Sequence, residues 1–152
     1  MKINEAHLHV FIDCVVRYFD MVSDFKASVG SPYLISNVGE KLDEYTGIIS
    51  ISGSMKGSIF FTASKAMLAY LLRDLGSFIS TEEHKLLDLV GEIGNTISGN
   101  ARAEFGEQFI LSVPLVMKGK SEQLAVSETY QIFVIPIVWK QQKANLIINL
   151  SA

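Results

Sequence analysis

The sequence contains two arrays in which a long helical pattern is followed by three strand-like runs, and this order restricts the possible folds. The first pattern follows Asn4, a residue that can cap a helix, and its apolar residues recur at spacings of three and four until about Gly30. The second begins with Ser80-Thr81-Glu82-Glu83, which has capping-box spacing, and continues to about Phe105. The recurrence predicts an α+β protein with two similar halves, although the halves share almost no residue identity.

The strand-like runs are rich in β-branched and aromatic residues, and short turn sequences separate them. They comprise residues 33–38, 45–52 and 57–62 in the first half and residues 109–117, 126–139 and 144–150 in the second. Between the halves, Ser64 can cap a short helix that ends at Gly76, where a left-handed conformation is expected. The predicted fold is a pseudo-symmetric repeat of a helix followed by three mostly antiparallel strands, with the long helices packed on the sheet.

Length and composition predict one domain that associates with itself. The 152 residues fit a single domain spanning residues 1–152, and no linker or low-complexity segment divides them. With 49% hydrophobic and 19% charged residues, the chain is apolar for a soluble domain of this size. A buried interface would cover this apolar excess, and pairing of strand edges between subunits is one way to form it. We therefore expect a homodimer, although the sequence does not indicate which edge is used.

Charge and hydropathy argue against several classes of function. The net charge of −3 and the isoelectric point near 5.6 provide no basic surface for nucleic acid. The start of the sequence lacks the apolar region of a signal peptide, and apolar runs such as residues 132–139 are too short to cross a bilayer. We therefore expect a cytoplasmic protein that does not insert into membranes.

Cysteine and histidine give no sign of a metal or redox site. The lone Cys14 lies among apolar residues and is expected to be inert packing. His7 and His9 face different sides of their helix, and His84 has no second histidine at ligand spacing. We expect the protein to have no cofactor of its own.

The second long helix has two contrasting faces. At about 100° per residue, one apolar stripe must face the core, and it is formed by Leu86, Val90, Ile93, Ile97 and Ala101. The opposite face is formed by Asp88, Glu92, Asn95, Gly99 and Arg102. Glu92 and Asn95 are neighbours there because they lie three residues apart. On residue types alone, such a pair most often belongs to a merely solvated face.

Three glycines interrupt the same helix, and each lowers its propensity by about 1 kcal/mol relative to alanine. Close approach of another element would explain them. Gly94 lies on a flank suited to packing against the first helix, whereas Gly91 and Gly99 lie nearer the polar face, where a partner could dock. Ser98 has no plausible histidine partner and the glycines form no phosphate loop, so serine hydrolysis and nucleotide binding lack support.

Residues 88–101, DLVGEIGNTISGNA, contain Glu-x-x-Asn at Glu92 and Asn95, followed by Gly-Asn-Ala. This stretch resembles the signature helix of the CheC, CheX and FliY family of chemotaxis proteins, although Thr96 and Ser98 stand where apolar or alanine residues are common. Residues 45–53 with Gly57, and Ser112-Val113-Pro114, look like further family segments. CheC-type members have the motif in both halves, whereas the first helix here lacks it, so the chain resembles the CheX branch.

The resemblance implies a protein phosphatase that hydrolyses the phosphoaspartate of a CheY-type response regulator. It implies that Asn95 orients the attacking water and that Glu92 pairs with a lysine of the receiver domain. A general-base role for Glu92 ranks second, because an exposed carboxylate is a weak base. Asp88, Gly91 and Gly99 are expected to contact the partner. The phosphorylated receiver would bring its own Mg²⁺.

Two other interpretations stay open. In one, the chain is a non-catalytic receiver-binding or scaffold module, like the flagellar-switch relatives of the family. In the other, it is a structural homodimer whose Glu-x-x-Asn pair is incidental, and substitution of Asn95 would change nothing measurable. CheX relatives form dimers by strand pairing, and the resemblance implies the same here.

Overall fold

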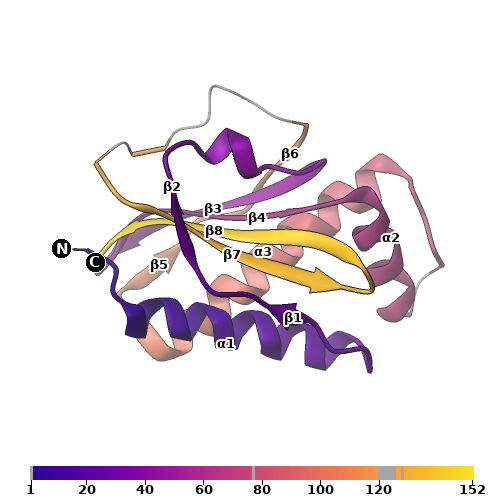
Figure 1. Cartoon of the computed structure of the whole chain (residues 1–152), viewed down its shortest axis with the longest axis horizontal. Coiled ribbons are helices and arrows are strands. Elements are labelled where there is room, and N and C mark those ends of the chain that lie inside the picture. The colour runs from indigo at the N-terminus through magenta and orange to yellow at the C-terminus, as the bar shows by residue number, and fades with distance from the viewer. Residues whose placement is uncertain (1, 77, 120–125, 128) are drawn as a thin grey trace.

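The computed structural model describes residues 2–76, 78–119, 126–127 and 129–152, and its strands form one antiparallel sheet with the α-helices on one face (Figure 1). The helices are α1 Glu5–Val22, α2 Lys65–Asp74 and α3 Glu83–Phe105, with a 3-10 helix η1 at Val38–Lys41. The strands are β1 Ser28–Val29, β2 Tyr33–Ile35, β3 Tyr45–Gly53, β4 Lys56–Ala63, β5 Phe109–Leu111, β6 Leu115–Lys118, β7 Ile132–Trp139 and β8 Gln142–Ser151. The predicted α+β class is confirmed.

The two halves of the molecule exchange their edge strands. The order across the sheet is β1-β7-β8-β4-β3-β5, and β2 also pairs with β7 while β6 also pairs with β3. The edge made by β1 and β2 thus belongs to the first half but pairs with the second, and the edge made by β5 and β6 does the reverse. At the centre, β4 and β8 join the halves. Neither half completes its part of the sheet alone.

A glycine sets how closely α3 lies on the sheet. A Cβ on Gly47 of β3 would lie 2.5 Å from the carbonyl oxygen of Val90, so only glycine admits the helix at this distance. A Cβ on Gly94 of α3 would lie 3.7 Å from Cγ1 of Ile49 and from Cβ of Phe61, so Gly94 faces the sheet and not α1 as predicted. Helix α3 therefore packs directly on β3 and β4, and the main core lies between the helices and this face of the sheet.

A second, smaller apolar cluster covers the other face of the sheet. It consists of Val38, Leu42, Phe60, Ile132, Val134 and Ile147. On this side, Asn149 of β8 is fully buried, and its Nδ2 donates to the carbonyl oxygens of Ser127 and Tyr130 at 3.2 and 3.3 Å. The run 126–139 therefore becomes a strand only from Ile132, later than predicted; residue 128 lies outside the described residues.

Helix α1 ends at Val22 instead of near Gly30. Its predicted cap is confirmed, since the Asn4 side chain accepts a hydrogen bond from the third helical residue. At the other end, the Ser23 hydroxyl donates to Asp74 at 2.7 Å and accepts from the backbone N–H of Phe25 at 3.0 Å. A contact with α2 therefore replaces the next helical turn.

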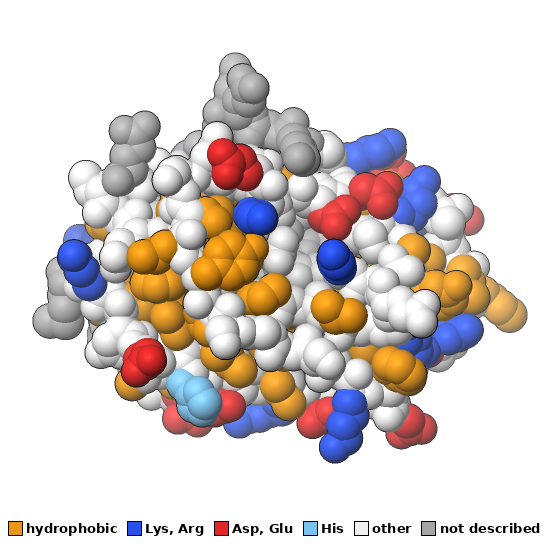
Figure 2. Space-filling model, viewed as in Figure 1, with side chains coloured by type: hydrophobic (Ala, Val, Ile, Leu, Met, Phe, Trp, Pro, Cys, Tyr) orange, Lys and Arg blue, Asp and Glu red, His pale blue; other side chains and the backbone are white. Residues whose placement is uncertain are grey.

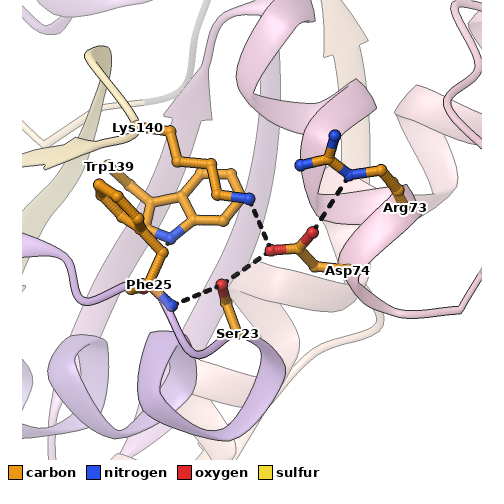
Figure 3. Close-up of polar contacts among 6 residues, drawn as sticks. All are labelled: Ser23, Phe25, Arg73, Asp74, Trp139 and Lys140. Carbon is orange, nitrogen blue, oxygen red and sulfur yellow. Dashed lines mark hydrogen bonds and ion pairs between the residues drawn. The ribbon is translucent and has the colours of Figure 1, made fainter.

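The Asp74 cluster joins the ends of α1, α2 and β7 and consists of Ser23, Phe25, Arg73, Asp74, Trp139 and Lys140 (Figure 3). The Asp74 carboxylate also accepts hydrogen bonds from Lys140 Nζ at 3.0 Å and Arg73 Nε at 3.4 Å. Trp139 Nε1 donates to the carbonyl of Phe25 at 2.9 Å. Burial would raise the pKa of Asp74, but the hydrogen bonds from Ser23, Lys140 and Arg73 outweigh burial and lower that pKa.

Other local predictions had mixed outcomes. Ser64 caps α2 and Gly76 has a φ of +94°, as expected. The prediction of a capping box at Ser80 is wrong, because the N-cap of α3 is Glu82, whose side chain makes no capping hydrogen bond. The strand predicted for residues 33–38 ends at Ile35, since Asn37 caps η1 instead.

Exposed apolar side chains lie at both edges of the sheet. Hydrophobic side chains gather over β2 on the face seen in Figure 2, and Leu34 of this strand is 55% exposed. At the other edge, Ile110, Val113 and Leu115 are 47%, 83% and 65% exposed. Either edge offers apolar surface to another chain.

Candidate functional site

Helix α3 presents the two faces that its sequence predicts. The five residues of the predicted apolar stripe are fully buried, whereas Asp88, Glu92, Asn95 and Arg102 are exposed. The helix packs on β3 and β4 and is flanked by α1 and β6. Glu92 and Asn95 are therefore exposed neighbours on a helix whose other face is fixed by the core.

Glu92 lies near Tyr18 of α1, a side chain that is almost fully buried. Burial raises the pKa of Tyr18, and the negative charge of Glu92 raises it further, so the phenol stays neutral beside the carboxylate. Within the part of the chain that the structure describes, the side chain of Glu92 forms no hydrogen bond or ion pair. Its carboxylate is available to a cation from another molecule.

Asn95 is equally uncommitted. Neither its Oδ1 nor its Nδ2 has a hydrogen-bond partner among the described residues. A carboxamide presents a hydrogen-bond acceptor and a donor on one planar group. The pair thus offers a charge, an acceptor and a donor within one helical turn, and the fold uses none of them.

The glycines of α3 differ in their surroundings. Gly91 is buried, and a Cβ there would lie 2.8 Å from Cγ1 of Val116 and 3.5 Å from Cβ of Pro114. Gly91 thus borders the exposed face but is covered by its neighbours, and packing against β6 explains the glycine. Gly99 is exposed, with nothing within 4 Å of the place that a Cβ would take. Gly99 and Asp88 remain predicted partner contacts, whereas the packing of Gly91 gives its predicted partner role no support.

A β-bulge that the sequence did not lead us to predict lies beside Gly91 of α3. Leu111 pairs with Ile51 and Leu115 pairs with Ile48, so three residues, 112–114, lie opposite two residues of β3. This bulge divides the predicted strand 109–117 into β5 and β6. The proline within it was the available signal, since a proline in a strand pattern marks an edge or a bulge.

Other potentially reactive groups are accounted for by packing. Burial raises the pKa of the Cys14 thiol to about 11, so it is not a thiolate nucleophile at neutral pH. The Oγ of Ser98 is buried and has no hydrogen-bond partner among the described residues. In that same part of the chain, no group of three His, Cys, Asp or Glu side chains could hold a metal ion, and no helix is long and apolar enough to cross a membrane.

Comparisons with known proteins agree with this architecture. The family described as chemotaxis phosphatase CheX matches residues 45–138, whereas a search of curated proteins gives no match. A CheC-like superfamily protein from Shewanella sp. PV-4 has a TM-score of 0.83 at 22% identity, over 99% of this chain and 100% of that chain. A putative chemotaxis protein from Desulfovibrio vulgaris Hildenborough has a TM-score of 0.81 at 26% identity, with the same coverage.

A third similar structure is the CheX-CheY-BeF3-Mg²⁺ complex from Borrelia burgdorferi, with a TM-score of 0.76 at 18% identity, over 96% of this chain and 98% of that chain. The family match covers more than half of the sequence and includes all of α3 with Glu92 and Asn95. The fold agrees over nearly the whole chain. The chain therefore belongs to the CheX family of chemotaxis phosphatases.

Proposed function

We propose that the protein hydrolyses the phosphoaspartate of a CheY-type receiver domain, with Glu92 and Asn95 as the residues that act on the partner. The supporting observation is that both side chains are exposed one turn apart on α3 and have no partner among the described residues. Among the described residues, the buried Thr46, Thr62 and Asn149 instead use their side chains in hydrogen bonds within the fold. A polar pair that the fold leaves unused suits a group supplied by another molecule.

In this reaction, a water oxygen attacks phosphorus and the bond between phosphorus and the aspartate oxygen breaks. The products are the free carboxylate and inorganic phosphate, and the proton of the water passes to phosphate or solvent. Catalysis of such a transfer consists mostly of positioning and electrostatics. Asn95 suits the positioning, because its Oδ1 can accept a hydrogen bond from the water while its Nδ2 donates to a phosphoryl oxygen.

Glu92 is proposed to anchor the receiver through a lysine. A charge-assisted contact of this kind would fix the register of α3 on the partner so that Asn95 enters the site. Asp88 and Gly99 lie on the same exposed face and are proposed partner contacts. The related Borrelia complex contains CheY, BeF3 and Mg²⁺, which supports a receiver that carries the metal and the phosphoryl group to the reaction.

We further propose a cytoplasmic homodimer formed by strand pairing. The exposed edges formed by β1 with β2 and by β5 with β6 are both available for such pairing. Sedimentation equilibrium of the purified chain would give its mass in solution. Leu34→Ser, at the β2 edge, would lower that mass if this edge joins the subunits.

The first experiment measures loss of the acyl phosphate from CheY-type receivers of the same organism, with and without the protein. Asn95→Ala should lose most of the acceleration while still binding the receiver, and Glu92→Ala should mainly raise KM. Thr96→Ala, an exposed neighbour on α3, is the matched control. If the wild-type protein binds receivers but accelerates none of them, the chain is instead a non-catalytic receiver-binding or scaffold module.

A further inference from the structure

We propose that Val113, Pro114 and Val116, here called the bulge surface, form a second docking surface for the receiver beside Glu92 and Asn95. The inference rests on the proposed function and extends it from the polar pair to an adjoining apolar surface. It assigns a role to the Ser112-Val113-Pro114 sequence, which the proposed chemistry does not use.

Hydrogen bonds hold the bulge in a defined shape. The backbone N–H of Ser112 donates to the Ser50 carbonyl at 2.9 Å, and the Ser50 N–H donates to the Ser112 Oγ, also at 2.9 Å. The Ser112 hydroxyl in turn donates to the Val113 carbonyl at 3.1 Å. Val113 is nonetheless 83% exposed. The chain thus holds an apolar side chain out in solvent on a fixed support, and bulges of this kind re-aim side chains near functional sites.

Two residues of the bulge surface, Pro114 and Val116, lie on the flank of α3 that leads to Asn95. Pro114 and Val116 pack against Gly91, and their side chains occupy the space that a Cβ on Gly91 would need. Asn95 follows Gly91 by four residues, so both lie on the same side of the helix. Val116 remains 41% exposed although it packs against Gly91. The apolar side chains of Pro114 and Val116 therefore adjoin the flank on which the carboxamide stands, and the exposed Val113 directly precedes Pro114 in the chain.

The receiver is the occupant that this arrangement favours. A molecule that brings a phosphoryl group to Asn95 must lie across the exposed face of α3, and on this flank its next contact is with the bulge surface. Interfaces combine a buried apolar core with polar contacts at the rim, and apolar contacts supply affinity without altering the chemistry. The partner should accordingly present apolar side chains beside its phosphorylated aspartate.

The test compares Val113→Ser with Ile110→Ser in the full-length protein. Ile110 is 47% exposed on the same edge, but its neighbours Phe109 and Leu111 pack toward the main core, so Ile110 points to the opposite face of the sheet. The measurements are kcat and KM for dephosphorylation, affinity for the beryllofluoride- and Mg²⁺-loaded receiver, and mass in solution. Val113→Ser should raise KM and lower the affinity for the loaded receiver about tenfold, with kcat unchanged. Ile110→Ser should change KM and this affinity less than about twofold.

Two results would overturn the inference. If the wild-type protein is active and Val113→Ser leaves KM and affinity unchanged, the receiver does not use the bulge surface. If Val113→Ser lowers the mass in solution while KM stays constant, the surface joins two copies of this chain instead. Failure of the proposed function looks different: the wild-type protein would accelerate no receiver, and weaker binding of the loaded receiver by Val113→Ser would still support docking.

Discussion

The Asp74 cluster and the exposed face of α3 both concentrate polar side chains, but they use them in opposite ways. The Asp74 carboxylate accepts hydrogen bonds from Ser23, Lys140 and Arg73, which join segments distant in the sequence. The side chains of Glu92 and Asn95 form no hydrogen bond or ion pair with any described residue. Polar groups that pair with each other stabilise the fold, whereas polar groups left unpaired on a rigid helix are free to act on another molecule.

The largest effect that this comparison predicts is on catalysis. Asn95→Ala should lower kcat about a hundredfold, the loss typical of removing one positioned hydrogen-bonding group. Its free energy of unfolding should change by less than about 0.5 kcal/mol, because the fold does not use the side chain. Dephosphorylation kinetics and urea unfolding of the same preparation would check both. A parallel loss of stability would break the comparison by giving Asn95 a structural role.

Asp74→Ala should show the reverse pattern. Removing the carboxylate leaves Lys140 and Ser23 without their partner, and the free energy of unfolding at pH 7 should fall by about 2 kcal/mol. Dephosphorylation by the folded protein should be unchanged. Urea unfolding measures the loss, and Arg73→Ala is the matched control with a smaller effect, because its hydrogen bond is the longest of the three at 3.4 Å.

The pH dependence sharpens this prediction. The folded-state pKa of Asp74 is lowered, so its carboxylate stabilises the fold at pH values above the unfolded-state pKa of about 3.9. That contribution is lost as the pH falls through the lowered folded-state pKa. The stability difference between wild type and Asp74→Asn should therefore be constant near neutral pH and shrink below about pH 4. A difference that persists in acid would mean that the charge is not what stabilises the cluster.

Two glycines of α3 should respond in opposite directions to alanine. Gly91→Ala places a Cβ against Val116, and this overpacking should cost about 1 to 2 kcal/mol net of the gain in helix propensity. Gly99→Ala meets nothing and should stabilise the protein by about 0.5 to 1 kcal/mol. Thermal unfolding would measure both. If a partner approaches Gly99, the same variant should bind the receiver more weakly; unchanged binding would remove Gly99 from the proposed interface.

The last expected effect, similar in size to that of Gly99→Ala, concerns Ser98. Its buried Oγ has no hydrogen-bond partner among the described residues. Ser98→Ala should stabilise the protein by about 1 kcal/mol, because it removes the cost of burying an unpaired hydroxyl and because alanine has the higher helix propensity. Activity should not change. A drop in kcat with intact stability, measured alongside Thr96→Ala, would instead place this hydroxyl in the functional site.

Much of the secondary structure and the candidate pair could be predicted from local pattern. The bounds of β3, β4 and the end of α3 agree with the sequence predictions to within a residue. The signals that predict them are local in the sequence: the strand-like residue pattern, the helical spacing of apolar residues and Gly106 after the helix. The exposure of Glu92 and Asn95 could be predicted because they lie on the side of α3 opposite its apolar stripe, which is buried. The capping box at Ser80 shows the limit of such reasoning, since the right spacing occurs there without the interaction.

The sequence by itself thus determined the order of helices and strands and the pair that α3 exposes, since these depend on residues close along the chain. Tertiary structure alone decided where α1 stops, how the bulge forms and why Gly91 and Gly99 differ. Each of these depends on a distant partner: Ser23 and Asp74 lie 51 residues apart, and Ser50 and Ser112 lie 62 residues apart. The contact between Ser50 and Ser112 forms only because β5 and β6 of the second half pair with β3 of the first, and no local pattern encodes that exchange.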